Sequence, residues 1–222
     1  MSLTRAQYFD AWSQNHAGID PKSSPFIAGY LSVLWPLIGL LSRTRVSPNV
    51  VTVVGGVVSS LAVVLAALFA PDFVAVIALA GLLLDAVDGG LAIATKKVST
   101  LGGVLDSVFD RIHEVAVVAA VFILIPENVQ LVVMTVAATF AVEYARARSL
   151  SLQQSLSVKL TAWERPTRVL IPMSMALLWM WETPPLLSLE QWFTLGWSIQ
   201  CFLAVFSTIL TLKFVHDSLA EG

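Results

Sequence analysis

Six apolar stretches, each long enough to cross a lipid bilayer, restrict what this sequence can fold into. A membrane-spanning helix needs about 20 residues. The chain of 222 residues is 57% hydrophobic and only 13% charged, which is typical of a polytopic membrane protein rather than of a soluble domain. We therefore predict an all-α fold with six transmembrane helices, near residues 49–70, 73–95, 102–125, 128–147, 166–182 and 192–213.

The charged residues indicate how these helices are oriented. With the N-terminus inside, the outer connections hold only the acids Asp72, Glu127, Glu182 and Glu190. This asymmetry follows the positive-inside rule, so we expect a multi-pass protein of the plasma (inner) membrane with both termini in the cytoplasm. With the N-terminus inside, all 13 basic residues fall on the inner side or at inner helix ends: Arg5, Lys22, Arg43, Arg45, Lys96, Lys97, Arg111, Arg146, Arg148, Lys159, Arg165, Arg168 and Lys213.

Nothing in the sequence, including its net charge of −2, indicates nucleic-acid binding.

A further apolar stretch, residues 24–42, precedes the first predicted span and is interrupted by Pro36. A seventh span here would leave Arg5 and Lys22 on the outer side, against the positive-inside rule. We therefore favour an amphipathic helix lying in the inner interface, where Trp35 suits the headgroup level. A seventh span remains the alternative.

Four carboxylates stand inside the second and third apolar stretches. Asp85 and Asp88 are three residues apart, and Asp106 and Asp110 are four apart, so each pair lies on one face of its helix. A short connection joins the two helices, so the acidic faces are able to converge. Four carboxylates in a low-dielectric setting stay ionised only if a cation shares the space. Hard oxygen ligands favour Mg²⁺, Mn²⁺ or Ca²⁺, and we predict a divalent metal site, with room for two metals.

Small and polar residues adjoin these acids. Gly89 and Ala92 follow Asp88 and leave a low surface that lets a bulky group approach. Gly102 and Gly103 do the same on the other helix, or mark its frayed start. At the start of the first predicted span, either Ser47, Asn49 and Thr52 cap the helix, or Pro48, Asn49 and Thr52 face the site from the cytoplasmic rim.

Four arginines gather at the inner boundary of the fourth and fifth predicted spans. Ordinary positive-inside anchoring explains a lone arginine. A cluster on the same side as an acidic metal site favours a phosphate-bearing substrate, because guanidinium forks match phosphate oxygens. The cluster comprises Arg146, Arg148, Arg165 and Arg168, and Glu164 is placed to orient one of these guanidinium groups. Arg111 and Glu114, outside the cluster, are interpreted as a structural pair.

The acidic stretch resembles the signature of the CDP-alcohol phosphatidyltransferase family, D-x2-D-G-x2-A-R-x8-G-x3-D-x3-D. One position departs from it, because Ile93 stands where the signature has Arg. The segments SPNVVT, YARAR and ERPTR are also similar to family segments, those of the branch that uses inositol phosphate and related acceptors, so the likeness covers about residues 40–172. The matching residues are Asp85, Asp88, Gly89, Ala92, Gly102, Asp106 and Asp110.

This resemblance implies a phospholipid-synthesising transferase that moves a phosphatidyl group from a CDP-lipid, such as CDP-diacylglycerol, to a small alcohol and releases CMP. It implies two Mg²⁺ or Mn²⁺ ions on Asp85, Asp88, Asp106 and Asp110, with Asp110 as general base. Pro48, Asn49, Thr52, Asp85, Gly89, Ala92 and Gly102 would contact the CDP-lipid. Arg146, Arg148, Arg165 and Arg168 would bind an acceptor phosphate, as in inositol phosphate or glycerol phosphate. A homodimer is also implied.

The predicted organisation is a single membrane domain over residues 48–216. Residues 1–47 form the cytoplasmic N-terminal segment with the interfacial helix, and residues 217–222 a cytoplasmic tail. Three alternatives stay open. The chain is a nucleotide- or lipid-binding member without activity, as Ile93 suggests; it uses a CDP-linked small alcohol with a lipid acceptor; or it is a cation-coupled transporter, since buried carboxylates also mark ion pathways.

Overall fold

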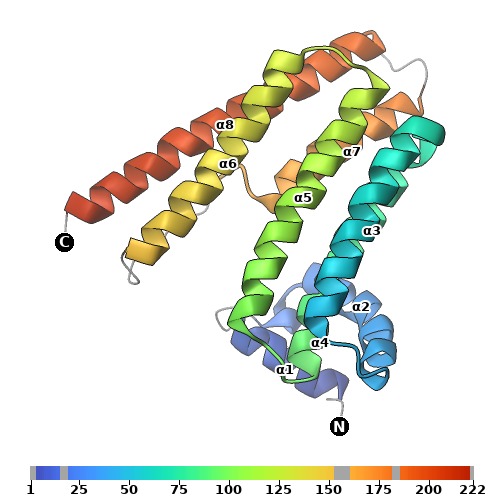
Figure 1. Cartoon of the computed structure of the whole chain (residues 1–222), viewed down its shortest axis with the longest axis vertical. Helices are drawn as coiled ribbons and strands as arrows, with labels where there is room; N and C mark the ends of the chain where they lie inside the picture. Colours follow the sequence, from blue (N-terminus) through green and yellow to red (C-terminus); the bar gives the residue numbers. More distant parts are fainter. Residues whose placement is uncertain (1–3, 16–19, 153–160, 182–185, 221–222) are drawn as a thin grey trace. The chain divides into compact units, whose positions relative to one another are not determined.

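The computed structural model describes residues 4–15, 20–152, 161–181 and 186–220. Within these ranges the fold is all-helical, with no strand (Figure 1). Two 3-10 turns, η1 (Pro21–Ser23) and η2 (Pro71–Phe73), separate some of the helices. The α-helices are α1 (Arg5–Asn15), α2 (Pro25–Arg43), α3 (Pro48–Phe69), α4 (Val74–Ala94), α5 (Thr100–Leu124), α6 (Val129–Leu152), α7 (Arg165–Trp179) and α8 (Leu189–Ala220).

The six predicted apolar stretches correspond to α3 through α8, and residues 24–42 correspond to α2. Among the described residues, four segments are long and apolar enough to cross a membrane: Pro48–Phe69, Pro71–Ala94, Val129–Ser151 and Leu189–Ser218. Helix α5 is long enough but carries four charged residues, and α7 has only 15 residues. The all-helical membrane fold is therefore confirmed, whereas six spans, and an interfacial rather than spanning α2, remain predictions.

Local sequence explains where several helices begin. The Ser24 hydroxyl caps α2 by accepting a hydrogen bond from the Ile27 N–H at 3.4 Å. Pro25 occupies the first turn, where a backbone N–H has no partner within the helix, so that the missing N–H of proline costs nothing. Pro48 opens α3 in the same way, as the sequence predicts. At the other end of the chain, α8 runs on through Ser218 to Ala220, into the predicted tail.

Helix α1 was not expected, because its sequence is polar and lies in the N-terminal segment that precedes the apolar stretches. Tyr8 and Phe9 of α1 are nonetheless buried. The Tyr8 ring lies 5.2 Å from the Trp35 ring of α2, centroid to centroid. These contacts hold α1 against a hydrophobic cluster formed with α2 and α4, whose buried members are Tyr8, Phe9, Leu31, Leu34, Ile38, Val87, Ile93 and Ala94.

The chain divides into two compact units. The first comprises Met1–Ala62 and Val76–His113, and the second Val63–Ala75 and Glu114–Gly222. In the second unit α6 packs along α8 (Figure 1). Polar side chains join this pair: Asn128 Nδ2 donates to Thr194 Oγ1 at 2.9 Å, and Thr208 Oγ1 donates to the Ala138 carbonyl at 3.2 Å. Such interhelical bonds are typical of helices packed within a membrane.

The outward surface of α3 is apolar along its length. Large hydrophobic side chains are exposed at almost every turn, which a water-soluble domain does not tolerate over such a length. Lipid is the solvent that suits them, and the chain is an integral membrane protein. The exposed residues are Val50, Val54, Val57, Val58, Leu61, Leu65, Leu68 and Phe69.

Lys159 and Glu182, two of the residues on which the predicted orientation depends, lie outside the described residues.

Candidate metal and substrate site

Three of the four predicted carboxylates converge in the first unit. Asp85 comes from α4, and Asp106 and Asp110 stand one turn apart on α5. Each offers a carboxylate oxygen, and the three oxygens lie within 4.8 Å of one another. Asp110 is buried, at 9% exposure, and the other two are half-buried. The i, i+4 spacing on α5 and the closeness of α4 place these groups together, as the sequence analysis expected.

This arrangement fits a divalent cation. Three carboxylates so close together repel one another strongly unless a positive charge lies among them. Arg111 offers limited compensation, because its Nη2 is 3.8 Å from Asp110 Oδ2. An all-oxygen, anionic set of ligands suits Mg²⁺ or Mn²⁺ better than softer metals.

Asp88 lies beside this group but is not one of the three. Its side chain is buried, and Oδ1 accepts from the Gly89 N–H at 2.5 Å. Oδ2 is buried with no well-formed hydrogen bond in the described residues; the Thr52 hydroxyl, which donates to the Pro48 carbonyl at 3.2 Å, lies near this carboxylate and interacts with it. A buried carboxylate oxygen without a well-formed hydrogen bond is unfavourable, and a cation or a ligand N–H or O–H would satisfy it.

A cavity of about 210 Å³ adjoins these acids, and we call it the carboxylate pocket. It brings together most of the residues predicted to contact the donor. Asn49 does not line it but lies close by, since a Cβ added to Gly102 would stand 3.0 Å from Asn49 Oδ1. Gly102 therefore permits the close approach of α3 to α5. The pocket is lined by Pro48, Thr52, Asp88, Gly89, Ala92, Ile93, Val98, Ser99, Gly102, Gly103 and Asp106.

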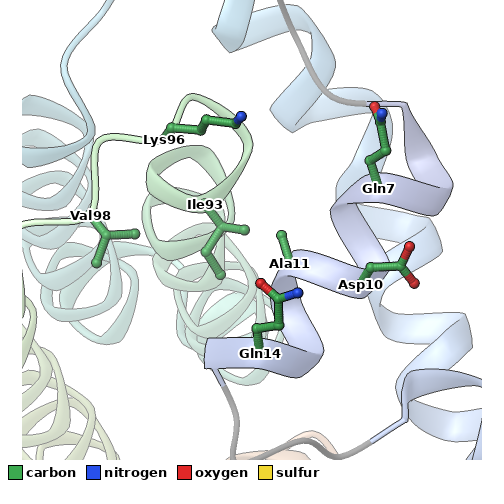
Figure 2. A pocket seen from close by; sticks show the side chains of 7 residues that line it. All are labelled: Gln7, Asp10, Ala11, Gln14, Ile93, Lys96 and Val98. Atoms are coloured by element: carbon green, nitrogen blue, oxygen red, sulfur yellow. The ribbon is translucent and has the colours of Figure 1, made fainter.

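Ile93, which replaces the signature arginine, is buried at 9% exposure in the cluster beneath α1. It also lines a second cavity of about 480 Å³ between α1 and the end of α4, which we call the α1 pocket (Figure 2). Sequence reasoning missed the α1 residues of this pocket, because nothing in a short polar helix links it to a motif 80 residues further along the chain. The pocket is lined by Gln7, Asp10, Ala11, Gln14, Ile93, Lys96 and Val98.

The predicted arginines belong to the second unit, where glutamates hold two of them. Arg146 binds Glu164 through two hydrogen bonds, Nη1 to Oε2 at 2.9 Å and Nη2 to Oε1 at 2.6 Å. Glu164 Oε1 also accepts from the Thr161 backbone N–H at 2.8 Å. Burial opposes ionisation of Glu164, but the bonds from Arg146 and Thr161 outweigh it and lower the pKa of this carboxyl. The expected orienting role of Glu164 therefore has a structural basis.

Arg168 is almost fully buried, at 4% exposure. Its Nη2 donates to Glu143 Oε1 at 2.6 Å, and its Nη1 lies 3.5 Å from Glu114 Oε2. Glu143 is also 3.7 Å from Arg146 Nη1. The sequence gives no signal for these contacts, because Glu143 and Glu114 stand 25 and 54 residues from Arg168 and belong to other helices.

The other two arginines differ in exposure. The side chain of Arg148 is exposed near the end of α6, and Arg165 is half-buried at the first position of α7. Elsewhere, His113 of α5 is buried, and its Nδ1 lies 3.3 Å from Ser59 Oγ of α3. This contact joins α5 to α3 within the first unit.

Comparison with known proteins adds to this geometry. The sequence model of the family described as CDP-alcohol phosphatidyltransferase matches residues 45–211. A curated relative, the archaetidylinositol phosphate synthase of Pyrococcus horikoshii, is 30% identical over 131 residues, which are 59% of this chain and 69% of the relative.

Solved structures of Mycobacterium tuberculosis phosphatidylinositol phosphate synthase (PgsA1) share the fold. The structure with CDP-DAG bound has a TM-score of 0.70 and 21% identity, covering 83% of this chain and 94% of the neighbour. The structure in complex with manganese and citrate has a TM-score of 0.69 and 22% identity, covering 81% and 87%. The signature residues and these likenesses agree on the same class of protein and on the predicted branch.

Proposed function

This chain belongs to the CDP-alcohol phosphatidyltransferase family, and from that premise we propose that it transfers a phosphatidyl group from a CDP-linked lipid to a small phosphorylated alcohol. The acceptor class is inositol phosphate or glycerol phosphate, and CMP is the second product. One observation carries the proposal: Asp85, Asp106 and Asp110 converge within 4.8 Å beside a pocket lined by the other signature residues.

The carboxylates are assigned to the donor's pyrophosphate. Asp85, Asp106 and Asp110 would hold Mg²⁺ or Mn²⁺, two ions per site, with Asp88 Oδ2 available as a further ligand. When bound, these ions neutralise the charge of the pyrophosphate and of the departing CMP. Gly89 and Ala92 leave the surface low, so the donor reaches the acids without meeting a side chain. Pro48, Thr52 and Gly102 line the pocket, and Asn49 lies close to Gly102.

Asp110 is assigned as the general base. Its carboxylate takes the proton from the acceptor hydroxyl, whose oxygen forms a bond to the lipid-linked phosphorus. The bond from that phosphorus to the bridging pyrophosphate oxygen breaks, and CMP leaves with that oxygen. Burial of Asp110 favours this role, because a base shielded from water is not consumed by competing proton exchange.

The arginines are assigned to the phosphate of the acceptor. Glutamates fix the orientation of Arg146 and Arg168, and the Nε atoms of both arginines are buried without a hydrogen-bond partner in the described residues. Unsatisfied cationic donors favour a phosphate ligand. Arg148 and Arg165 add positive charge at the same end of α6 and α7. An acceptor alcohol without a phosphate would leave the positive charge of these arginines without an anionic ligand.

The remaining assignments extend this proposal to the whole molecule. Both termini and the active site face the cytoplasm, residues 48–216 form the catalytic membrane domain, and the protein works as a homodimer. The positive-inside asymmetry of the sequence supports the orientation. The dimer rests on resemblance to the family.

The test is CMP release by the purified protein in detergent with CDP-diacylglycerol and Mg²⁺, against a panel of alcohols and their phosphates. We expect release with one phosphorylated acceptor, loss of release with EDTA, and a loss of at least about 100-fold in Asp110→Asn. Asp72→Asn, an exposed aspartate on η2, is the matched control and should retain full activity. Equal activity of Asp110→Asn and the wild type would refute the assignment of the base.

Ile93 favours a second candidate, a nucleotide-binding member with a changed donor or without turnover. The signature arginine would supply a charge at this position, and the structure has a buried aliphatic side chain there instead. Binding of CDP-diacylglycerol without CMP release across the whole panel would support this candidate over the transferase. CMP release from a CDP-linked small alcohol, with a membrane lipid as acceptor, would instead identify a changed donor.

A further inference from the structure

Glu143 contacts both of the arginines whose orientation is fixed by glutamates. Its Oε1 accepts a hydrogen bond from Arg168 Nη2 at 2.6 Å and lies 3.7 Å from Arg146 Nη1. A single carboxylate oxygen therefore lies between two guanidinium groups. A phosphate that binds both arginines would place one of its oxygens at this same position, because guanidinium groups bind carboxylate and phosphate oxygens with the same geometry.

Each of these arginines also has an acidic partner besides Glu143. Arg146 is bound by Glu164 through two hydrogen bonds, and Arg168 Nη1 lies 3.5 Å from Glu114 Oε2. Within the described part of the chain, three carboxylates thus contact two guanidinium groups. This excess of negative charge disfavours the binding of an anion for as long as all three carboxylates stay in place.

The three glutamates differ in how easily their carboxylates can leave the arginines. The side chain of Glu114 is 6% exposed and has no room to withdraw, whereas that of Glu143 is 32% exposed. Glu164 is half-buried, and bonds from Arg146 and from the Thr161 backbone N–H hold its carboxylate. Glu143 is therefore the carboxylate that a ligand can displace, since rotation about its side-chain bonds moves it away without any movement of α6.

We propose that Glu143 occupies the position of the acceptor phosphate in the free protein and is displaced when the acceptor binds, so that it determines which anions the arginines accept. The inference rests on the proposed function for the identity of the acceptor. A ligand with a single carboxylate only replaces one carboxylate by another, and the tethered Glu143 has the higher effective concentration. A phosphate monoester carries about −1.5 to −2 charges and three acceptor oxygens, and it displaces Glu143 where a carboxylate or a neutral alcohol does not.

The experiment measures the binding of inorganic phosphate to the full chain in detergent by calorimetry, without CDP-lipid or divalent metal. Glu143→Gln keeps the size of the side chain and removes the charge that competes with phosphate. We expect this variant to bind phosphate about tenfold tighter than the wild type, because a like charge within about 4 Å of the ligand is lost. Glu127→Gln, an exposed glutamate between α5 and α6, is the matched control and should bind phosphate as the wild type does.

The direction of the change separates this inference from a purely structural role. If Glu143 only held Arg168 in place, Glu143→Gln would bind phosphate more weakly, and that result overturns the inference. Equal affinities, or no phosphate binding by either protein, also overturn it. Glu143→Asp is a second variant, which decides by the same direction if Glu143→Gln does not fold. Its shorter side chain competes less for Arg168, so its affinity for phosphate should lie between those of the wild type and Glu143→Gln.

The outcomes also separate this inference from the proposed function, because phosphate binding requires no turnover. Tighter phosphate binding by Glu143→Gln supports the displacement of Glu143 even if no acceptor gives CMP release, a result that would count against the proposed function alone. CMP release by the wild type with unchanged phosphate binding in the variant would refute only the role of Glu143. Where turnover is present, Glu143→Gln should lower KM for the phosphorylated acceptor and leave KM for the CDP-lipid within about twofold.

Discussion

Two consecutive glycines on α4 have opposite surroundings. A Cβ added to Gly89 would meet no atom within 4 Å, and Gly89 lines the carboxylate pocket. A Cβ added to Gly90 would stand 2.8 Å from Tyr8 Oη and 3.3 Å from Ile38 Cγ1. One glycine therefore leaves space for a ligand, and the other leaves space for α1 and α2.

We predict that alanine separates these two roles. Gly89→Ala should fold at least as stably as the wild type, since alanine favours a helix by about 1 kcal/mol, yet lower CMP release about 10- to 100-fold by displacing the donor. Gly90→Ala should lower stability by about 1–3 kcal/mol through overpacking. Thermal unfolding in detergent and the CMP assay measure the two effects. A stable, fully active Gly89→Ala protein would contradict the assignment of the pocket.

At the scale of secondary-structure elements, an ion pair joins α6 to the start of α7. Arg146 of α6 holds Glu164, the residue before α7, with help from Thr161. These bonds lower the pKa of Glu164 below its ordinary value of 4.5 despite burial. A carboxyl with a lowered pKa stabilises the folded state fully above its unfolded pKa, and this stabilisation is lost as the pH falls through the folded pKa.

Glu164→Gln should therefore reduce stability in a pH-dependent way. We expect the wild type to unfold at a higher temperature than the variant at pH 7. The difference should shrink as the pH falls below 4.5, the ordinary pKa of this carboxyl, because the unfolded chain is then protonated. Unfolding midpoints in detergent from pH 3 to pH 7 measure this. Glu190→Gln, at an exposed position on α8, is the control and should show no such trend. If the difference in unfolding midpoint between wild type and variant stays constant with pH, Glu164 stabilises the fold by packing and neutral hydrogen bonds and not by its charge.

The helices themselves were predictable because apolar runs are long and charges mark their ends. The bounds of α3, α4 and α5 agree with the predicted stretches to within two residues. Helix α1 was missed because its polar sequence shows no such run, and only Tyr8 and Phe9 anchor it. The acidic pairs were predictable from spacing along single helices. The partners of Arg168 were not, since Glu114 and Glu143 come from two other helices.

At the scale of the whole molecule, the single cysteine allows the predicted orientation to be tested. Cys201 is buried at 8% exposure, so introduced cysteines should dominate labelling by a membrane-impermeant maleimide. Asp72→Cys, before α4, should react in intact cells. Lys97→Cys, after α4, should react only once the membrane is permeabilised, because α4 separates the two sides. Labelling of both from the outside would exclude the proposed topology.

Helix α5 also bears on how the protein is made. It carries Asp106, Asp110, Arg111 and Glu114, and a charged side chain near the middle of a membrane segment disfavours insertion by about 2.5–3.5 kcal/mol. Such a segment is poorly recognised by the translocation machinery when it emerges alone. Its entry into the bilayer would then depend on the preceding, strongly apolar α4, and the pair would insert as a hairpin. The residues that give this protein its chemistry would thus make its biogenesis cooperative.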